Sequence, residues 1–294
     1  MHWKDIAKKF IVVAIFGYLL YRLYVSWGEL ASYNFDLNYW LLAISIIIFL
    51  IFYFLEGLGY DILLKIMHCR IPFKAVLKAR YVSDMGRYIP GKIWTVLGRL
   101  YFLRRFKITK LQVIISSLLE MALMVSGGIL IFFLSLFFWD YDFGNWIYFI
   151  FLFIPLALIF LHPKFLNLGI KIIGKISKKK QPRIESKYCD LLSALAFYLF
   201  YWVVYGLGAF FIINAVYDLS YTKIPFIIGV FAISWFLGFV SFIAPGGLGV
   251  RDGLIVYFLM FIIPEPIAII IALLLRIILT LIEGLYAFVS LKLF

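Results

Sequence analysis

Two charged residues lie near the middle of long apolar segments, where charge is costly. Glu120 falls in segment 111–138, and Arg276 falls in segment 267–290. An arginine at the centre of a bilayer costs roughly 3 kcal/mol on insertion scales, so such a charge usually faces a protein interior and has a partner. Glu283 shares the helical face of Arg276. We therefore predict that Arg276 and either Glu120 or Glu283 line one polar cavity, although a buried ion pair that only orients helices would fit the same residues.

The apolar sequence is broken at two Pro-Gly sites, and a basic residue follows each break. Lys92 follows the first break, and Arg251 follows the glycine-rich second break. Glycines at a helix start leave backbone amides free to bind an anion, and the helix dipole favours the same occupant. The breaks therefore favour a phosphate-bearing substrate. The residues expected to form the breaks are Pro90, Gly91, Pro245, Gly246, Gly247 and Gly249, and those expected to contact substrate are Arg87, Lys92, Arg99, Glu120, Arg251, Arg276 and Glu283.

The composition indicates that lipid, and not water, is the main solvent of the chain. Of its 294 residues, 65% are hydrophobic and only 15% are charged. Because a spanning helix needs roughly 20 mostly apolar residues, the sequence predicts an all-α polytopic membrane protein with about six full spans. Hairpins 73–106 and 225–263, which contain the two breaks, either re-enter the membrane or cross it. The full spans are expected at 10–27, 39–64, 111–138, 146–161, 191–215 and 267–290.

The net charge of +13 is distributed in a way that needs no nucleic-acid partner to explain it, and we expect none. Basic connections, among them the loop 162–190, alternate along the chain with acidic ones. This alternation is the positive-inside pattern of a polytopic membrane protein. It places the basic connections and both termini in the cytoplasm, and we expect a prokaryotic cytoplasmic membrane.

A short glycine motif and the Pro-Gly breaks recur at similar intervals. Gly57-Leu58-Gly59 recurs as Gly206-Leu207-Gly208, and Pro90-Gly91 recurs as Pro245-Gly246. Each offset is roughly 150 residues, about half the chain, which predicts an internal repeat. An odd number of crossings between equivalent points would invert the second half relative to the first, as in transporters with a site near the midplane. The expected units are one membrane domain, 1–294, with halves 1–140 and 141–294.

The remaining motifs give no sign of a metal site, a cofactor or a nucleotide. Residues 86–92 match GxxxxGK, but Ile93 replaces the Ser or Thr that holds magnesium and no strand precedes the motif. The three histidines are scattered, and no HExxH or GxSxG motif occurs. Glu56 and Asp61, near one end of the second span, either contact the first hairpin or extend to the interface. We expect neither a cofactor nor a metal.

Two segments carry a resemblance to a known family. Arg87-Tyr88-Ile89-Pro90-Gly91-Lys92-Ile93-Trp94 with Gly98-Arg99, and Pro245-Gly246-Gly247-Leu248-Gly249-Val250-Arg251, resemble the paired signatures of the flippase-like family that includes the transmembrane region of lysylphosphatidylglycerol synthases. The resemblance implies a lipid flippase that moves an aminoacylated phospholipid or a polyprenyl-phosphate-linked sugar between leaflets. Since the sequence ends at Phe294, we expect a stand-alone translocator whose lipid is made elsewhere.

The sequence thus favours a flippase for an anionic, phosphate-bearing lipid, a transporter more than an enzyme. One alternative is a membrane-embedded transferase acting on a lipid phosphate, with Glu120 or Asp252 as the base. Another is a non-catalytic partner of a glycosyltransferase. The expected partners are therefore the anionic membrane lipid and either lipid-modifying enzymes or glycosyltransferases.

Overall fold

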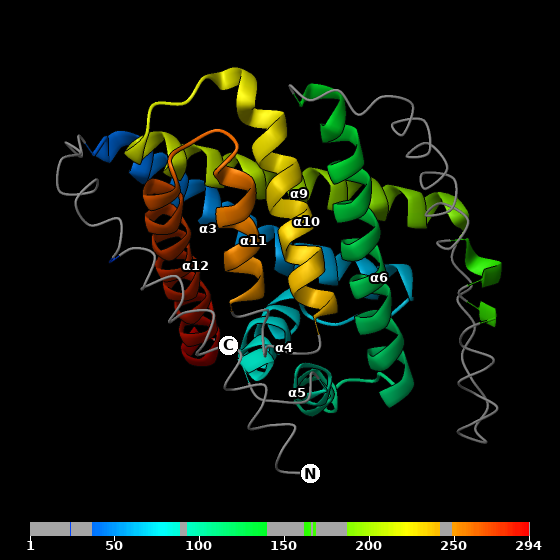
Figure 1. Cartoon of the computed structure of the whole chain (residues 1–294). Helices are drawn as coiled ribbons and strands as arrows, with labels where there is room; N and C mark the ends of the chain where they lie inside the picture. The colour runs from blue at the N-terminus through cyan, green and yellow to red at the C-terminus, as the bar shows by residue number, and fades with distance from the viewer. Residues whose placement is uncertain are drawn as a thin grey trace, which may run out of the picture.

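The computed structural model describes residues 37–88, 93–139, 162–165, 167–168, 187–241 and 249–293, together with Tyr24. The regular structure in these ranges is helical and contains no strand, which confirms the predicted all-α class for this part of the chain (Figure 1). The long helices are α3 (Tyr39–Ile66), α6 (Lys110–Ser135), α9 (Tyr188–Val216), α10 (Ile224–Val240) and α12 (Glu265–Leu293). The short ones are α4 (Phe73–Asp84), α5 (Trp94–Leu103), α11 (Val250–Leu259) and the 3-10 turns η1 (Met85–Tyr88), η2 (Leu136–Phe138) and η4 (Tyr221–Lys223).

Five of the described helices are long and apolar enough to cross a membrane. Four of them, α3, α6 with η2, α9 and α12, coincide with predicted spans. The fifth, Tyr221–Val240, differs from the prediction, which placed it in the first leg of hairpin 225–263. Its 20 residues reach about 30 Å, the thickness of the hydrocarbon core, so its length suffices for a full crossing. The predicted spans 10–27 and 146–161 lie outside the part of the chain described, apart from Tyr24.

The three short helices α4, α5 and α11 belong to the two predicted hairpins. They contain 12, 10 and 10 residues, which correspond to about 18, 15 and 15 Å. Each is roughly half as long as the hydrocarbon core is thick. The second break begins α11 at Gly249, whose φ of 80° is one that a side chain rarely adopts. The remaining break residues lie outside the described residues, as does Lys92; these break residues are Pro90, Gly91, Pro245, Gly246 and Gly247.

Helices α3 and α9 form an antiparallel pair at the centre of the bundle, where they run side by side behind α10 and α11 (Figure 1). At one end, the Asn38 amide donates to the Ala215 carbonyl at 3.0 Å. About two turns further along, the Ser45 hydroxyl donates to the Gly208 carbonyl at 2.6 Å. The Phe52 ring then stacks on the rings of Tyr201 and Tyr205. This buried seam fixes the positions of the elements that carry the charged residues.

The recurring glycine motif lies on this central pair and makes equivalent contacts in its two copies. A Cβ on Gly57 would clash with Leu77 and Tyr81 of α4, and one on Gly206 would lie 2.5 Å from the Ile228 backbone of α10. Each of these glycines therefore lets the next helix of its own half pack closely. On the other face, a Cβ on Gly59 would meet Tyr198 of α9 at 2.9 Å, and one on Gly208 would meet Phe49 of α3 at 2.8 Å.

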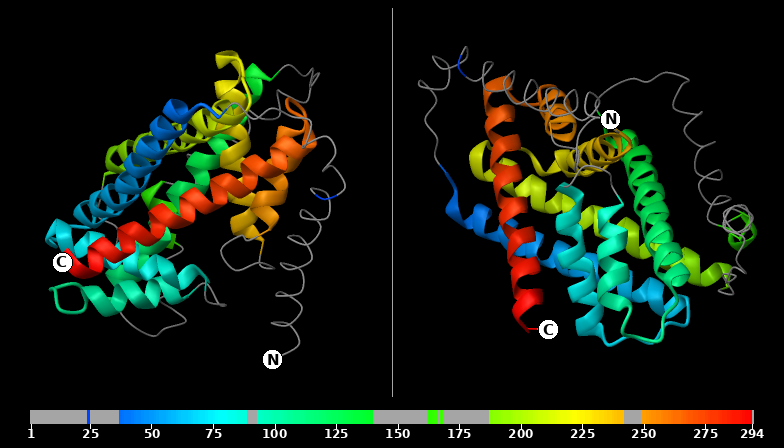
Figure 2. Two further views of the ribbon diagram at one scale, coloured as in Figure 1. Left: turned by 90° about the vertical axis from the view of Figure 1, so that its left-hand side faces the viewer. Right: turned by 90° about the horizontal axis from the view of Figure 1, so that it is seen from below.

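The last long helix of each predicted half packs against helices of the other. Helix α6 contacts α9 and α10, and α12 contacts α3 and α4. In the view from below in Figure 2, α6 and α12 lie on either side of α4 and α5. The two predicted halves are thus interlocked, and α4 packs against long helices of both.

Candidate functional site

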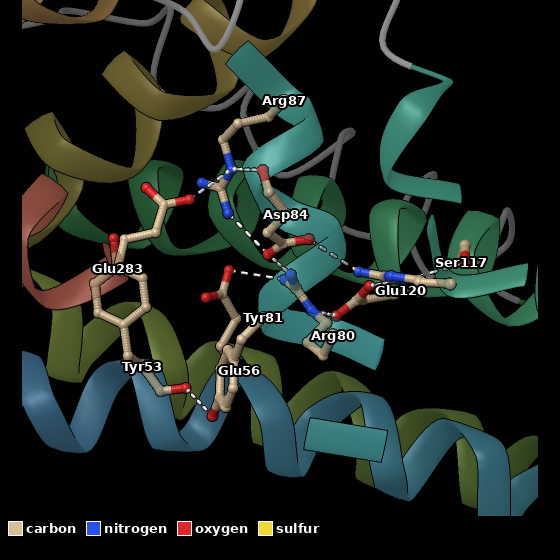
Figure 3. A network of polar contacts seen from close by, with 10 residues as sticks. Tyr53, Glu56, Arg80, Tyr81, Asp84, Arg87, Ser117, Glu120 and Glu283 are labelled. Carbon is tan, nitrogen blue, oxygen red and sulfur yellow. Dashed lines mark hydrogen bonds and ion pairs between the residues drawn. The ribbon is translucent and has the colours of Figure 1, made fainter. Parts of the chain in front are cut away.

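Helix α4 carries a buried arginine that joins three helices. The Arg80 side chain is 3% exposed and lies between Glu56 of α3 and Glu120 of α6 (Figure 3). Its Nη2 donates to Glu56 Oε1 at 2.8 Å, and its Nε donates to Glu120 Oε1 at 2.9 Å. Asp84, one turn further along α4, pairs with its remaining nitrogen. The close approach of α4 to α3 at Gly57 makes this arrangement possible.

A second buried arginine, Arg99 of α5, binds the other oxygen of Glu120. Its Nη1 donates to Glu120 Oε2 at 2.6 Å and to Ser117 Oγ at 3.2 Å, and its Nη2 lies 3.6 Å from Asp84 Oδ1. The guanidinium also lies 4.2 Å from the centre of the Tyr60 ring. A Cβ on Gly98 would lie 2.6 Å from the Ser83 hydroxyl, so α5 packs tightly on α4 and holds Arg99 inside the bundle.

The outer face of α5 explains why this helix points its arginine inward. Ile93, Trp94, Leu97 and Tyr101 are exposed at helical spacing, whereas Arg99 is buried on the opposite face. An exposed apolar stripe in a membrane bundle is suited to lipid contact.

Arg87 extends the network from the first hairpin to α12. Its Nη2 donates to Asp84 Oδ2 at 2.8 Å, and its Nε lies 3.1 Å from Glu283 Oε1 (Figure 3). With 31% of its side chain exposed, Arg87 is the most accessible member of this network among the residues that Figure 3 labels. It connects an element of the first half to the last helix of the second half.

A smaller cluster lies in the second hairpin, around Asp252 of α11. Asp252 Oδ1 is 3.7 Å from Arg251 Nε and 4.0 Å from Arg276 Nη1 of α12. The other carboxylate oxygen of Asp252 accepts from the Gly249 amide at 3.2 Å and so caps α11. Arg251 packs closely against α10, because a Cβ added to Gly238 of α10 would lie 3.0 Å from the Cβ of Arg251.

A cavity of about 160 Å³ lies between the two hairpins and brings these clusters together. Ligand pockets for drug-sized molecules are typically about 300–1,000 Å³, so the cavity suits a polar head group and not a whole lipid. The first hairpin and its flanking helices supply its charged wall, and α10 and α11 supply the wall opposite. The cavity is lined by Glu56, Arg80, Asp84, Arg87, Thr95, Val96, Arg99, Ser117, Glu120, Met121, Met124, Trp235, Gly238, Phe239 and Arg251.

The structure brings four predicted site residues to this cavity: Arg87, Arg99, Glu120 and Arg251. Arg276 and Glu283 lie just behind its wall and contact Asp252 and Arg87, respectively. Glu120 is held by Arg80 of α4 and Arg99 of α5, whereas Arg276 lies 4.0 Å from Asp252. Of the other predicted site residues, Gly249 begins α11, while Lys92 lies outside the described residues.

Sequence reasoning missed Arg80 and Asp84, which hold the network together. They lie in the predicted hairpin 73–106, whose many lysines and arginines made no single charge stand out. The available indication was their spacing, because Arg80 and Asp84 are four residues apart and form an ion pair along α4. Within the described residues, no group of three His, Cys, Asp or Glu is arranged to hold a metal ion.

The family model described as the lysylphosphatidylglycerol synthase TM region matches residues 7–285. No curated protein matches the chain.

Proposed function

Because the chain belongs to the lysylphosphatidylglycerol synthase TM-region family, it is an integral membrane protein with a lipid-related function, and we propose that it is a flippase. Its substrate is a lipid with an anionic, phosphate-bearing head group, which it moves between the leaflets. The head group enters the cavity between the two hairpins while the lipid tails stay in the bilayer.

The buried charge cluster at the cavity is the observation that carries this proposal. Four arginines line the cavity, and three of them, Arg80, Arg87 and Arg99, are held by buried carboxylates. Burying so many charges in a membrane protein is costly, and replacing buried ion pairs by apolar residues often stabilises a fold. A ligand accounts for the cluster, because the planar guanidinium fork binds phosphate oxygens in pairs. An entering phosphate would take over donors that the carboxylates hold in the empty cavity.

The arrangement of the helices supports an inverted repeat as the basis of transport. The central helices α3 and α9 are antiparallel. Helix α6 contacts α9 and α10 of the second half, and α12 makes the corresponding contacts with α3 and α4 of the first half. The hairpins then form an equivalent pair whose short helices α4, α5 and α11 re-enter the membrane without crossing it. Rocking one half against the other would open the cavity to each side in turn.

The charge on the surface gives the orientation of the bundle. Lys65, Arg70, Arg104, Arg105 and Lys107 are exposed in the connections at the ends of α3 and α5. The positive-inside rule assigns this end to the cytoplasm.

Reconstitution into liposomes tests the flippase function. Acyl-labelled anionic phospholipid in the inner leaflet becomes accessible to an impermeant quencher only if the protein moves it outward. We expect Arg251→Ala to slow this movement at least tenfold, because it removes a donor from the cavity wall. The matched control is Arg104→Ala, which removes an exposed arginine outside the cavity lining. Movement no faster than in protein-free liposomes, across several anionic lipids, would refute the function.

A further inference from the structure

Glu56, a residue of the cavity lining, has one carboxylate oxygen that accepts a hydrogen bond and one that is buried without a donor. Its side chain is buried in α3 and lines the cavity. Oε1 accepts from Arg80, whereas Oε2 accepts no hydrogen bond from any described residue. Figure 3 shows the second oxygen turned away from Arg80. A buried carboxylate oxygen without a donor is costly, so this atom calls for a donor from a ligand or from water.

Two arginines of the same cavity each have a donor nitrogen that requires an acceptor. Arg99 Nε and Arg251 Nε are buried and donate no hydrogen bond to a described residue, although Arg251 Nε has Asp252 Oδ1 at 3.7 Å. The residues of the cavity wall thus hold donors without an acceptor at the arginines and an acceptor without a donor at Glu56. A phosphate satisfies the donors only. The acceptor requires a second group on the same ligand, one that carries an O–H or N–H.

The charges around the cavity leave the choice between a hydroxyl and an ammonium to the rest of the lining. The lining holds four arginines against three carboxylates, Glu56, Asp84 and Glu120. When Glu283, Asp252 and Arg276 behind the wall are included, five positive charges face five negative ones. Either group can donate to Glu56, and a hydroxyl does so without adding charge.

The wall formed by α10 is suited to the carbon skeleton of a polyol. Trp235 and Phe239 line the cavity, with their ring centres 5.3 Å apart and their planes within 1° of parallel. Gly238, between them in sequence, also lines the cavity and adds no side chain. Two stacked rings offer a flat apolar surface beside the charged wall. A sugar ring or glycerol can place its carbon atoms there and its hydroxyls toward Glu56.

On these grounds we propose that Glu56 binds a hydroxyl of the head group, so that the substrates are phosphodiester lipids whose phosphate carries a polyol, either a sugar or glycerol. This proposal rests on the proposed flippase function, because it assigns the group attached to the phosphate of the same substrate in the same cavity.

Transport of four acyl-labelled probes by the full chain in liposomes tests the proposal. Phosphatidylinositol and phosphatidylglycerol carry hydroxyls, phosphatidylethanol has the same phosphodiester without a hydroxyl, and phosphatidylethanolamine carries an ammonium. We expect both polyol lipids to move at least tenfold faster than the other two, since a lost hydrogen bond to a buried charge is worth that factor. Equal rates for phosphatidylglycerol and phosphatidylethanol would overturn the proposal, as would fastest movement of phosphatidylethanolamine.

Glu56→Gln identifies the residue that carries this selectivity. Glutamine keeps an oxygen for Arg80 but replaces the other oxygen with an N–H donor, so the hydrogen bond from the lipid hydroxyl is lost. We therefore expect the preference for polyol lipids to fall to about twofold or less. The matched control is Asp61→Asn, a buried carboxylate on the same helix that pairs with Lys65 and is not part of the cavity lining. It should keep the wild-type preference. A preference that survives in Glu56→Gln would contradict the role of Glu56.

Binding separates this proposal from the flippase function. If no probe moves, the flippase function fails, and native mass spectrometry of the wild-type protein with the same four lipids decides the assignment of Glu56. Retention of polyol lipids over phosphatidylethanol, lost in Glu56→Gln, supports the proposal. Equal retention of all four lipids by the wild-type protein refutes it, even if the Glu56→Gln variant fails to fold.

Discussion

Replacing Glu120 by glutamine removes a negative charge that two buried arginines share. Glu120 accepts from Arg80 at 2.9 Å and from Arg99 at 2.6 Å. After the substitution, Arg80 keeps two close carboxylates, Glu56 and Asp84, whereas Arg99 keeps only Asp84 at 3.6 Å. Breaking a buried ion pair from one side costs about 3–5 kcal/mol, because the partner charge stays buried without compensation. We expect Glu120→Gln to lower the free energy of unfolding by this amount.

The matched comparison is Glu283→Gln, which removes a carboxylate from a more accessible arginine. Arg87 has 31% of its side chain exposed and keeps Asp84 at 2.8 Å, so solvent and a second partner compensate for the loss. We expect a cost of about 1 kcal/mol, in the range of a single partly solvated ion pair. Both variants are compared with the wild type by thermal or denaturant unfolding in detergent micelles, followed through tryptophan fluorescence.

Charge exchange locates the partner of Glu120. Placing arginine at 120 and glutamate at 99 should recover part of the lost stability, because the two side chains are in contact. The same exchange between positions 120 and 276 should recover none, since Arg276 contacts Asp252 instead. The reasoning is refuted if Glu120→Gln costs no more than Glu283→Gln, or if the exchange with Arg276 restores stability while that with Arg99 does not.

Two further predictions concern packing and accessibility. Gly206→Ala should destabilise the protein by about 1–3 kcal/mol, because the added Cβ would lie 2.5 Å from the backbone of Ile228. Gly284→Ala should be neutral or stabilising by up to about 1 kcal/mol, since nothing lies within 4 Å of the added Cβ. Equal unfolding midpoints for the two variants in the same assay would contradict this. Burial raises the pKa of the Cys69 thiol, so less thiolate is present at a given pH. Maleimide should therefore label Cys69 several-fold more slowly than the exposed Cys189. The labelling rate at Cys69 should still rise as the pH increases through the alkaline range. Faster labelling of Cys69, measured by mass spectrometry of the modified peptides, would contradict the buried position.

The sequence predicts those elements whose energetics are local. Helices α3, α6, α9 and α12 follow from apolar length alone, because each must satisfy its own backbone hydrogen bonds in lipid. Glu120 and Arg99 stand out in the same way, because a charge near an apolar run demands an explanation.

The partners of these charges depend on tertiary packing and were not predictable from one segment. Arg80 and Asp84 lie in a basic, moderately polar segment, and only the close approach of α4 to α3 at Gly57 turns that segment into membrane interior. Helix α10 begins at Ile224, one residue before the predicted start of its hairpin, and together with the preceding 3-10 turn it reaches the length of a full span.

The interlocked halves have a consequence for how the chain is made. During synthesis, α4 emerges long before α12, the helix that covers it and supplies Glu283 to Arg87. Until then the charges of α4 lack that cover, and a segment that is only half as long as a span cannot hold itself in the bilayer. Docking of the first hairpin is therefore complete only after the final helix has emerged from the ribosome. A chain cut between its predicted halves would lack a complete site in either piece, so assembly of the site and the proposed transport depend on one continuous polypeptide or on co-expression of the two pieces.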